Sequence, residues 1–479
     1  MENLRILFAA SEVVPFAKTG GLADVAGSLP KELKKIGQDV RIVMPKYGCI
    51  SKEYTDKMEY VGYTYVNMGW RHQYCGIFKL LYDGIIVYFI DNEYYFNRLG
   101  LYGYNDEGEQ FTFFSKALIE MLPVIGFKPD IIHCNDWQTG VVSLLLQAHY
   151  SHLSFYEGIK TVYTIHNLKY QGVFPKEVLR ELLSVGWEYF TDDKIEFYDQ
   201  VNFMKSGIVF SDAITTVSKT YAEEIKCDFF GENLNIPIHH HAGKLYGILN
   251  GIDNETNDPA SDQRLYANFT ADNLAPKYMN KKNLQKDLGL PQKANTPVIG
   301  IISRLVDQKG FDLIAQVLPE ILALDLQIIV LGSGEYRYEC MFKQAAADFP
   351  GKLSANIKYD GVLAQRIYAG SDMFLMPSLF EPCGLSQLFS LRYGTIPIVR
   401  ETGGLNDTIQ SYNELTQEGN GFTFSNYNSY DMVHTLKRAL SFYKQKKIWQ
   451  GIVKKGMQQD FSWTKSAQEY VDLYDKLFR

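Results

Sequence analysis

Short apolar runs alternate with longer amphipathic segments along the whole chain. Such runs are typical of strands that are buried on both faces of a parallel sheet, and the amphipathic segments between them fit crossover helices. The pattern therefore predicts an α/β fold. In the first half the expected strands are 4–10, 40–44, 85–90, 131–133, 162–166 and 213–217. In the second half they are 298–303, 327–331, 373–376 and 396–399.

The segment between these two groups of strands predicts a domain boundary. Residues 247–253 are followed by a polar stretch, 254–283, that has no clear hydrophobic period. Each half has more strands than one sheet needs, so we expect two doubly wound domains, 1–247 and 248–462. In such domains ligands bind outside the carboxyl ends of the strands. Helical hydrophobic spacing near the end predicts a closing amphipathic helix within 463–479.

The composition indicates a globular protein and argues against several other classes. The 479 residues are 46% hydrophobic and 22% charged, which is a globular composition, and the net charge of −7 argues against general attraction to nucleic acid or an anionic membrane. No apolar run approaches the ~20 residues that span a bilayer, and the first apolar run is too short for a secretory signal. The six cysteines lie far apart, which fits the reducing cytoplasm. Aromatic residues reach 14%, and their rings suit sugar or base stacking as well as core packing.

The first expected strand is followed by a glycine turn that suits an anion. Lys18-Thr19-Gly20-Gly21 leads into an expected helix, 22–36. Paired glycines let a backbone approach a ligand, and free N–H groups at a helix start favour negative charge, to which the lysine adds a cation. A purely structural turn is the alternative. A similar Thr-Gly-Gly-Leu sequence recurs at 402–405.

Two strand ends of the second half carry comparable chemistry. Arg304 and Lys309 follow the strand 298–303 and could neutralise a diphosphate, or instead form a solvated loop with a neighbouring carboxylate. Glu381 is held extended by the proline after it, and a carboxylate accepts hydrogen bonds from sugar hydroxyls. Gly384 opens an expected helix whose free amides favour a phosphate.

Two further strand ends are polar. Asp136 and Trp137 place a carboxylate beside a stacking ring, as carbohydrate sites do. His166 ends the next strand; a lone histidine there is more often structural, but two polar clusters at corresponding strand ends favour a function. The three histidines at 239–241 have no further ligand at metal spacing, so we expect no metal site.

The chain contains no G-x-G-x-x-G, G-x-x-x-x-G-K-[ST], H-E-x-x-H or G-x-S-x-G motif. These absences argue against a dinucleotide dehydrogenase, a P-loop NTPase, a zincin and an esterase.

Taken together, five motifs resemble the bacterial glycogen synthase and plant starch synthase family. They occur in order at 18–25, 135–137, 247–253, 303–310 and 380–387. The resemblance implies a GT-B fold, in which two Rossmann-like domains face each other across a deep cleft and the last helix crosses back to the first domain. It implies a hexosyltransferase that moves glucose from ADP-glucose to the non-reducing end of an α-1,4-glucan, with retention of configuration and with neither a metal ion nor another cofactor.

The resemblance also implies roles for particular residues. The catalytic group is Lys18, Asp136, His166, Arg304, Lys309 and Glu381. The substrate-binding group is Gly20, Gly21, Asp24, Tyr95, Trp137, Asn250, Tyr359, Cys383, Gly384, Leu385 and Ser386. The cations would neutralise the diphosphate, Tyr359 would stack on adenine, and the amides of Leu385 and Ser386 would take the proximal phosphate. Glu381 would bind the glucose hydroxyls, and Tyr95 falls where relatives bind the glucan.

The implied reaction needs no covalent intermediate. His166 and Asn250 would orient the sugar, while Asp136 and Trp137 would line the junction of donor and acceptor. Fixed cations on the leaving diphosphate supply electrostatic stabilisation. The residue eight positions after the catalytic glutamate is Phe389, where many retaining GT-B enzymes have a second glutamate. We therefore expect the departing phosphate to help deprotonate the acceptor.

Several alternatives stay open on sequence chemistry alone. A UDP-glucose-dependent GT-B transferase is one alternative. It differs in the base that it recognises, and Tyr359 alone does not distinguish adenine from uracil. A glycogen phosphorylase is less consistent, because that family needs a pyridoxal-phosphate lysine in a longer chain. The intact cationic and carboxylate positions argue against a non-catalytic glucan-binding protein. The expected partners are ADP-glucose and the glucan, and we expect binding to neither nucleic acid nor a membrane. The sequence does not indicate the oligomeric state.

Overall fold

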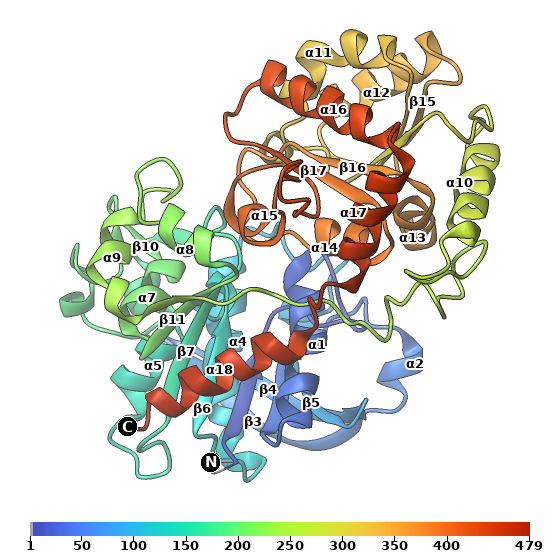
Figure 1. Cartoon of the computed structure of the whole chain (residues 1–479). Coiled ribbons are helices and arrows are strands. Elements are labelled where there is room, and N and C mark those ends of the chain that lie inside the picture. The colour runs from blue at the N-terminus through green and yellow to red at the C-terminus, as the bar shows by residue number, and fades with distance from the viewer. Residues whose placement is uncertain (1–2) are drawn as a thin grey trace. The chain divides into compact units, whose positions relative to one another are not determined.

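The computed structural model describes residues 3–479 and divides the chain into two compact units (Figure 1). The first unit contains the described residues up to Gly251 together with Trp463–Arg479, and the second contains Ile252–Ser462. The predicted boundary, between residues 247 and 248, precedes this division. The chain therefore leaves the first unit, builds the second, and returns to the first.

The first unit is built on a nine-stranded sheet. Its strands are β1 (Arg5–Ala9), β2 (Asp39–Pro45), β3 (Glu59–Met68), β4 (Arg71–Tyr82), β5 (Ile85–Asp91), β6 (Ile131–Asn135), β7 (Lys160–Ile165), β11 (Ala213–Thr216) and β12 (Leu245–Gly247). The order is β12-β11-β7-β6-β1-β2-β5-β4-β3. Neighbours are parallel from β12 to β5, whereas β4 is antiparallel to both β5 and β3. A small antiparallel sheet contains β8 (Val173–Pro175), β9 (Glu196–Phe197) and β10 (Gln200–Asn202).

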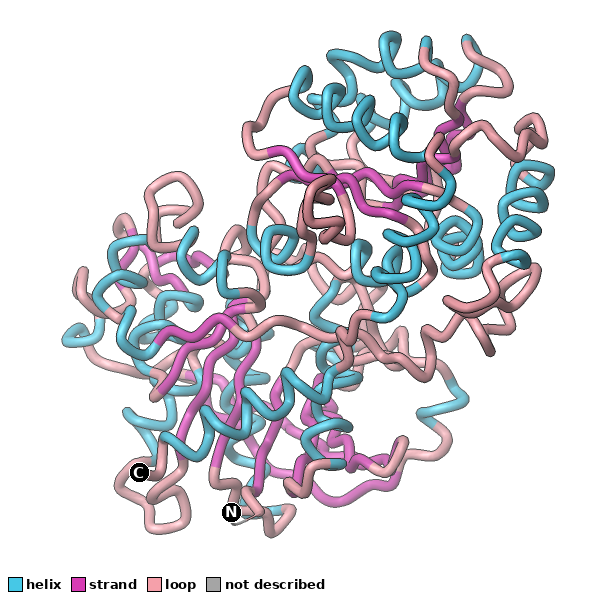
Figure 2. The backbone as a smooth tube through the Cα atoms, in the orientation of Figure 1, coloured by secondary structure: helices cyan, strands magenta, loops and turns pink. Residues whose placement is uncertain are grey.

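Helices cover both faces of the strands (Figure 2). The α-helices of the first unit are α1 (Gly21–Lys35), α2 (Lys52–Thr55), α3 (Glu93–Phe96), α4 (Glu107–Val124), α5 (Val142–Leu145), α6 (Val178–Glu181), α7 (Phe203–Phe210), α8 (Lys219–Glu224), α9 (Asn235–His240) and α18 (Trp463–Lys476). The other helical turns are η1 (Trp137–Thr139), η2 (Leu146–Tyr150), η3 (Trp187–Tyr189) and η4 (Ala242–Lys244).

The last helix, α18, belongs to the first unit and packs against α1; Figure 1 draws it in red beside the blue helix. Its buried face includes Tyr470, Val471 and Tyr474. The Tyr474 hydroxyl lies 2.6 Å from His133 Nδ1, and His133 Nε2 lies 2.6 Å from Thr164 Oγ1. A buried polar chain thus joins the helix to β6 and β7. Burial lowers the pKa of His133 to about 3, so its ring is neutral.

The second unit contains a six-stranded sheet whose neighbours are all parallel. Its strands are β13 (Val298–Ile302), β14 (Gln327–Leu331), β15 (Leu353–Asn356), β16 (Met373–Met376), β17 (Ile396–Arg400) and β18 (Phe422–Phe424), in the order β15-β14-β13-β16-β17-β18. Its helices are α10 (Ala275–Asp287), η5 (Asp307–Lys309), α11 (Phe311–Ala323), α12 (Tyr336–Asp348), α13 (Gly361–Gly370), α14 (Ser386–Arg392), α15 (Gly403–Thr408), α16 (Ser429–Tyr443) and α17 (Lys446–Gln458).

These two sheets confirm the predicted α/β class, and every strand predicted from an apolar run is present. The long hairpin β3–β4 was not predicted. Its residues alternate between exposed and buried, as Tyr65 and Asn67 lie outside while Val66 and Met68 are fully buried. Such period-two strands do not form the continuous apolar runs of a strand covered on both faces.

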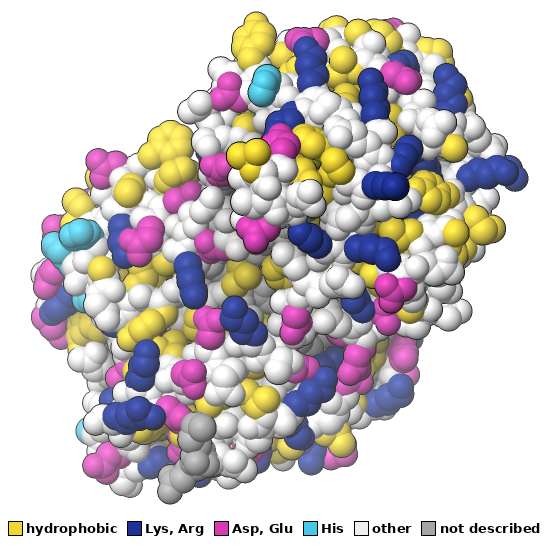
Figure 3. Space-filling view, in the orientation of Figure 1, with side chains coloured by type: hydrophobic (Ala, Val, Ile, Leu, Met, Phe, Trp, Pro, Cys, Tyr) yellow, Lys and Arg dark blue, Asp and Glu magenta, His cyan; other side chains and the backbone are white. Residues whose placement is uncertain are grey.

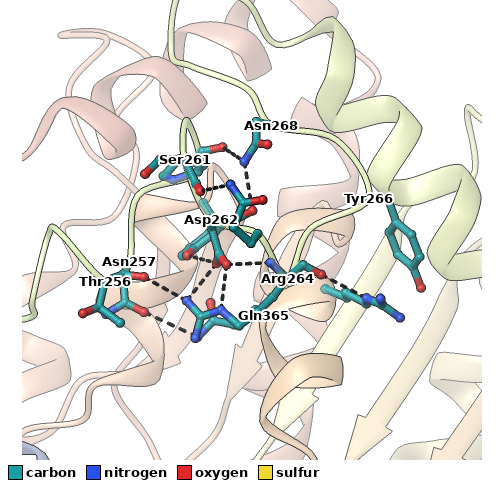
Figure 4. Close-up of polar contacts among 12 residues, drawn as sticks. Thr256, Asn257, Ser261, Asp262, Arg264, Tyr266, Asn268 and Gln365 are labelled. Carbon is teal, nitrogen blue, oxygen red and sulfur yellow. Dashed lines mark hydrogen bonds and ion pairs between the residues drawn. The ribbon is translucent and has the colours of Figure 1, made fainter.

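The polar stretch before α10 is organised by side chains rather than by a hydrophobic face (Figure 4). Arg264 Nε donates to Asp262 Oδ1 at 2.7 Å, and its Nη2 donates to the carbonyl oxygen of Thr256 at 2.9 Å. Asn268 Nδ2 donates to the carbonyl oxygens of Pro259 and Asp262. Because these hydrogen bonds need no apolar periodicity, the sequence shows none here.

Candidate functional site

The Lys18-Thr19-Gly20-Gly21 turn follows β1 and leads into α1, which begins at Gly21, as predicted. Lys18 Nζ lies 2.7 and 2.8 Å from the two carboxylate oxygens of Asp24. The two side chains are 40% and 32% exposed, so the cation stays accessible to solvent. Burial raises the pKa of Asp24, and the Lys18 ammonium opposes that shift.

The glycines of this turn are not required by the packing around them. A Cβ atom at Gly20 or Gly21 would meet nothing within 4 Å, and Gly20 has φ −143°. Alanine would therefore fit at either position. Open space beside the start of a helix is what a ligand needs in order to approach the backbone.

Glu12, which the sequence analysis does not single out, holds the turn in place. Its carboxylate accepts the N–H groups of Thr19 and Gly20 at 2.5 and 3.1 Å, the Thr19 hydroxyl at 2.5 Å and the Tyr102 hydroxyl at 2.8 Å. The residue is 4% exposed. The carboxylate also occupies the amide of Gly20, one of the residues that the resemblance places in the substrate-binding group. Its position just after the first strand is the signal that could have identified it.

The carboxyl ends of the neighbouring strands β6 and β7 bring Asp136 and His166 together. The backbone N–H of His166 donates to Asp136 Oδ1 at 2.8 Å, and His166 Nε2 lies 2.9 Å from Asn135 Oδ1. Asn135 Nδ2 in turn donates to the carbonyl oxygen of Ala9 at 3.0 Å. Asp136 has φ +55°, a left-handed conformation that costs energy for a residue with a side chain. Such strain concentrates at functional sites.

The pKa values of Asp136 and His166 are both shifted from their ordinary values. Burial raises the pKa of Asp136 to about 7, partly offset by the N–H groups of His166 and Asn167, while the charge of Glu12 adds to the rise. Burial lowers the pKa of His166 to about 3. At neutral pH the imidazole is therefore uncharged and acts through hydrogen bonds, while the Asp136 carboxyl is partly protonated.

Two aromatic residues expected to contact substrate are packed inside the first unit. Trp137 is 7% exposed, with its ring 5.0 Å from that of Phe111 and 5.8 Å from that of Phe174. Tyr95 has 0% exposure, and its hydroxyl donates to Glu109 Oε1 at 2.5 Å. Burial of this kind gives both rings packing roles. Their contact with substrate stays a prediction.

In the second unit, Lys309 and Glu381 form a largely buried ion pair. Lys309 Nζ lies 2.6 Å from Glu381 Oε2, with side-chain exposures of 18% and 7%. Ser378 Oγ donates to the same oxygen at 3.1 Å. Lys309 follows β13 and Glu381 follows β16, and these two strands are parallel neighbours. Their carboxyl ends therefore place a cation beside a carboxylate.

The second Thr-Gly-Gly-Leu sequence, 402–405, packs against the Glu381 loop. The Gly404 N–H donates to the carbonyl oxygen of Glu381 at 3.1 Å. A Cβ atom at Gly403 would lie 2.0 Å from that oxygen, and one at Gly404 would lie 2.0 Å from the carbonyl oxygen of Cys383. Gly403 also has φ +44°. Packing and backbone conformation therefore require glycine here.

Arg400 supports the same loop and was not predicted. Its Nε donates to the carbonyl oxygen of Ser378 at 2.8 Å, its Nη1 to that of Ser425 at 3.2 Å, and its Nη2 to that of Leu379. The residue is 7% exposed. Its place at the end of β17 is the signal that sequence reasoning could have used.

The predicted amide donors surround the start of α14. This helix begins at Ser386, with Leu385 as the preceding residue and no side-chain cap. Gly384 has φ +72°, which suits a glycine. Gln387 Nε2 donates to the carbonyl oxygens of Cys383 and Gly384 at 3.0 and 2.9 Å, which fixes the turn before the helix.

Three other predicted residues differ in accessibility. Arg304 is exposed after β13, and Tyr359 is 85% exposed after β15, so both can reach a ligand. Asn250 is 5% exposed, and its Oδ1 has no hydrogen-bond partner among the described residues. A buried acceptor in this state can be satisfied by a ligand hydroxyl.

Within residues 3–479, no group of three or more His, Cys, Asp and Glu side chains could hold a metal ion. In the same part of the chain, no helix combines the length and apolar character needed to cross a membrane. On the face drawn in Figure 3, lysine and arginine are interspersed with aspartate and glutamate rather than gathered into one basic patch.

Comparisons with known proteins identify the family. A family model described as the starch synthase catalytic domain matches residues 5–240, and one described as group 1 glycosyl transferases matches residues 281–455. A glycogen synthase from Desulforamulus reducens is 57% identical over 99% of both chains. The chain belongs to the glycogen synthase family. Another member, from Geobacillus thermodenitrificans, is 52% identical over 99% of this chain and 98% of its own.

Solved structures agree with this glycogen synthase assignment. The catalytic domain of starch synthase IV from Arabidopsis thaliana, bound to ADP and acarbose, matches with a TM-score of 0.93 and 36% identity over all of both chains. A sucrose-phosphate synthase from Thermosynechococcus elongatus matches with a TM-score of 0.63 at 15% identity, which shows the fold alone. The predicted GT-B fold of two Rossmann-like domains, the hexosyltransferase class and the glycogen synthase function are confirmed.

Proposed function

We propose that this glycogen synthase transfers glucose from ADP-glucose to the non-reducing end of an α-1,4-glucan, with retention of configuration and without a metal ion. The observation that carries the proposal is the Lys309–Glu381 pair, 2.6 Å apart at neighbouring strand ends of the second unit. It combines a cation for a phosphate with an acceptor for sugar hydroxyls. ADP bound to the starch synthase IV relative supports the choice of donor.

The donor half of the reaction uses fixed charge. The bond from glucose C1 to the distal phosphate oxygen breaks, and its electron pair stays on that oxygen. Arg304 and Lys309 stabilise the negative charge of the leaving ADP, which is the electrostatic role that a divalent ion fills in other transferases. Glu381, oriented by Lys309 and Ser378, accepts hydrogen bonds from glucose hydroxyls. Tyr359 offers an exposed ring to the base.

The first unit supplies a cation and a sugar-orienting pair. Lys18 contributes a solvent-accessible cation. The neutral His166 and the unpartnered Asn250 Oδ1 hydrogen-bond to sugar hydroxyls without adding charge near the positive sugar carbon. Asp136 accepts the backbone N–H of His166 and is partly protonated. The acceptor oxygen bonds to C1, and its proton passes to the departing phosphate oxygen, so the products are the extended glucan and ADP.

No covalent glucosyl-enzyme forms in this proposal. The Glu381 carboxylate is engaged by Lys309 and Ser378. Phe389, eight positions later, packs its ring 5.7 Å from that of Tyr368 and offers no nucleophile. A glucosyl adduct found by mass spectrometry of the native enzyme during turnover would contradict this mechanism.

The six free cysteines are consistent with activity in the cytoplasm.

The test is a comparison of donors on glycogen, with variants of the pair. We expect kcat/KM with ADP-glucose to exceed that with UDP-glucose by about 10²-fold. Lys309→Met and Glu381→Gln should each lower kcat by about 10²- to 10³-fold. Lys437→Met is the matched control, because Lys437 forms an exposed pair with Glu320 at 2.7 Å in the same unit.

Equal or higher rates with UDP-glucose would favour the UDP-dependent alternative. Unchanged kcat in both pair variants would remove Lys309 and Glu381 from the mechanism. Chain-length analysis of the product checks that glucose is added to the non-reducing end.

A further inference from the structure

The side chain of Asn135 lies across the carboxyl ends of three neighbouring parallel strands. Asn135 is the last residue of β6, which pairs with β1 on one side and with β7 on the other. Its Nδ2 donates to the carbonyl oxygen of Ala9, at the end of β1, at 3.0 Å, and to that of His133 at 3.4 Å. Its Oδ1 lies 2.9 Å from Nε2 of His166, the residue that follows β7. Asn135 is 0% exposed, so water does not compete for these contacts.

The two carbonyl oxygens determine which way the amide of Asn135 points. A carbonyl oxygen only accepts hydrogen bonds, so the NH2 group must face Ala9 and His133. The reverse orientation would set the amide oxygen against two other acceptors in a buried place, where unpaired polar groups are costly. Oδ1 is therefore the atom that faces His166.

The amide oxygen in turn determines where the ring of His166 carries its proton. Oδ1 has no proton to give, so Nε2 must carry one and donate it. Burial lowers the pKa of His166 to about 3, and a neutral imidazole has a single N–H. Nδ1 is therefore the unprotonated nitrogen and a hydrogen-bond acceptor.

The Nδ1 atom of His166 is left for a ligand. Within residues 3–479, the hydrogen bonds of His166 are those from its backbone N–H to Asp136 Oδ1, at 2.8 Å, and from its Nε2 to Asn135. The residue is partly exposed. Its backbone and one ring nitrogen are thus held by protein, while the other ring nitrogen has a lone pair to offer.

Asn135 is itself held firmly enough to act as a support. Its backbone N–H donates to Thr139 Oγ1 at 2.7 Å, and Thr139 Oγ1 donates to the Asn135 carbonyl oxygen at 2.9 Å. A side chain on a fixed strand end orients its neighbour more precisely than one on a mobile loop.

We propose that Asn135 is a positioning residue, which holds His166 in the Nε2–H tautomer so that Nδ1 accepts a hydrogen bond from a hydroxyl of the transferred sugar. The inference rests on the proposed glucosyl transfer. It gives the contact a direction, because the sugar hydroxyl must donate. A fixed acceptor discriminates against a group that has no proton to donate, such as an ether oxygen.

The first measurement uses the native enzyme without substrate. Nitrogen-15 chemical shifts of selectively labelled histidine distinguish a protonated from an unprotonated ring nitrogen, and the spectrum of His166→Gln identifies the signals of His166. At neutral pH we expect Nε2 to be protonated and Nδ1 to be unprotonated. The opposite assignment, or a mixture of both tautomers, overturns the proposal.

Two variants at position 135 separate positioning from packing. Asn135→Leu offers no acceptor, so the tautomers of His166 should mix and kcat should fall by about 10- to 10²-fold. Asn135→Asp keeps an acceptor at Nε2, so the tautomer should stay fixed, while the added charge should raise the pKa of the ring. The other titratable groups beside the ring, Asp136 and His133, are unchanged in both variants.

Asn280→Leu in the second unit is the matched control. Asn280 is also 0% exposed, its Oδ1 accepts the N–H of Tyr266 at 3.1 Å, and its Nδ2 donates to the carbonyl oxygen of Ala267 at 2.6 Å. Its loss should lower the melting temperature and leave the nitrogen shifts of His166 and kcat unchanged.

Two further outcomes overturn the proposal. Unchanged His166 shifts in Asn135→Leu show that another group sets the tautomer, and a mixed tautomer with unchanged kcat shows that transfer does not use it. If Asn135→Leu does not fold, the spectra of the native enzyme and of Asn135→Asp decide. Because the shifts are measured without donor, failure of the native enzyme to transfer glucose from ADP-glucose would contradict the proposed function and leave the tautomer assignment intact.

Discussion

Two loops of this enzyme share the sequence Thr-Gly-Gly-Leu and differ in what the glycines do. In the first unit, Cβ atoms at Gly20 and Gly21 would enter open space, and the loop is held by the buried carboxylate of Glu12. In the second unit, Cβ atoms at Gly403 and Gly404 would collide with backbone oxygens at 2.0 Å. One pair of glycines leaves room beside a helix start, whereas the other lets two stretches of backbone touch.

The difference teaches that an identical motif can be retained for opposite physical reasons. The first loop is fastened by a side chain and keeps its outer surface clear, as a ligand site requires. The second loop is held by main-chain contacts. Its Gly404 N–H donates to the carbonyl oxygen of Glu381 and so helps to position that residue. Substitution at the first should act on activity, and substitution at the second on folding.

The largest effect is expected for Gly403→Ala. The new methyl group would need backbone displacement, and φ +44° adds strain, so the second unit should lose about 3 kcal/mol. By calorimetry its melting temperature should fall by about 6 to 12 °C. Gly451→Ala on α17 is the control, since its Cβ would meet nothing within 4 Å. An unchanged melting temperature for Gly403→Ala would show that the loop can move aside.

Gly21→Ala should separate activity from stability in the opposite sense. Alanine favours a helix over glycine by up to about 1 kcal/mol, so the melting temperature should stay level or rise. If the donor phosphates approach this backbone, kcat/KM for ADP-glucose should fall by about 10²-fold. Gly243→Ala is the control in the same unit, because open space also surrounds that position. Full activity in Gly21→Ala would argue that no ligand approaches the turn.

Glu12→Gln should loosen only the first loop. The amide would put a donor against N–H and O–H donors, so we expect the first unit to lose about 1 to 3 kcal/mol. Because the Glu12 charge raises the pKa of Asp136, the variant should also lower that pKa, as read from carboxyl chemical shifts. Glu157→Gln, at an exposed position, is the control. A destabilised variant with an unmoved Asp136 pKa would limit Glu12 to packing.

The most gradual expected effect is a dependence of stability on pH. The raised pKa of Asp136 means that the folded state holds a proton between about pH 4 and 7 that the unfolded state has released, so this group makes stability fall as pH rises. The lowered pKa of His166 acts in the opposite direction between about pH 3 and 6.5. Asp136→Asn should therefore steepen the rise of stability with pH between about 4 and 6.5, by about 1.4 kcal/mol per pH unit at most. Denaturant titrations of the variant and the native enzyme at pH 4.5 and 6.5 give the difference, and parallel profiles would contradict the assigned pKa.

The parallel strands of both sheets could be predicted from the sequence, because strands buried on both faces appear as continuous apolar runs. It placed candidate residues at the strand ends, and the structure brings Asp136 to His166 and Lys309 to Glu381. It missed β3 and β4, whose half-exposed pattern is aromatic on the outside. It also missed Glu12 and Arg400, because a supporting residue is defined by its partners in space. It assigned Tyr95 by likeness alone, and only coordinates reveal that its ring is fully buried.

The position of α18 bears on how the chain is made. The helix completes the first unit, with Tyr474 reaching His133. A ribosome synthesises the whole second unit before this helix appears. During translation the second unit can reach its native state while the first still has an uncovered sheet surface. A fragment that spans 252–462 should therefore fold alone more readily than one that ends at residue 251, and chaperones should bind the nascent chain chiefly through its earlier half.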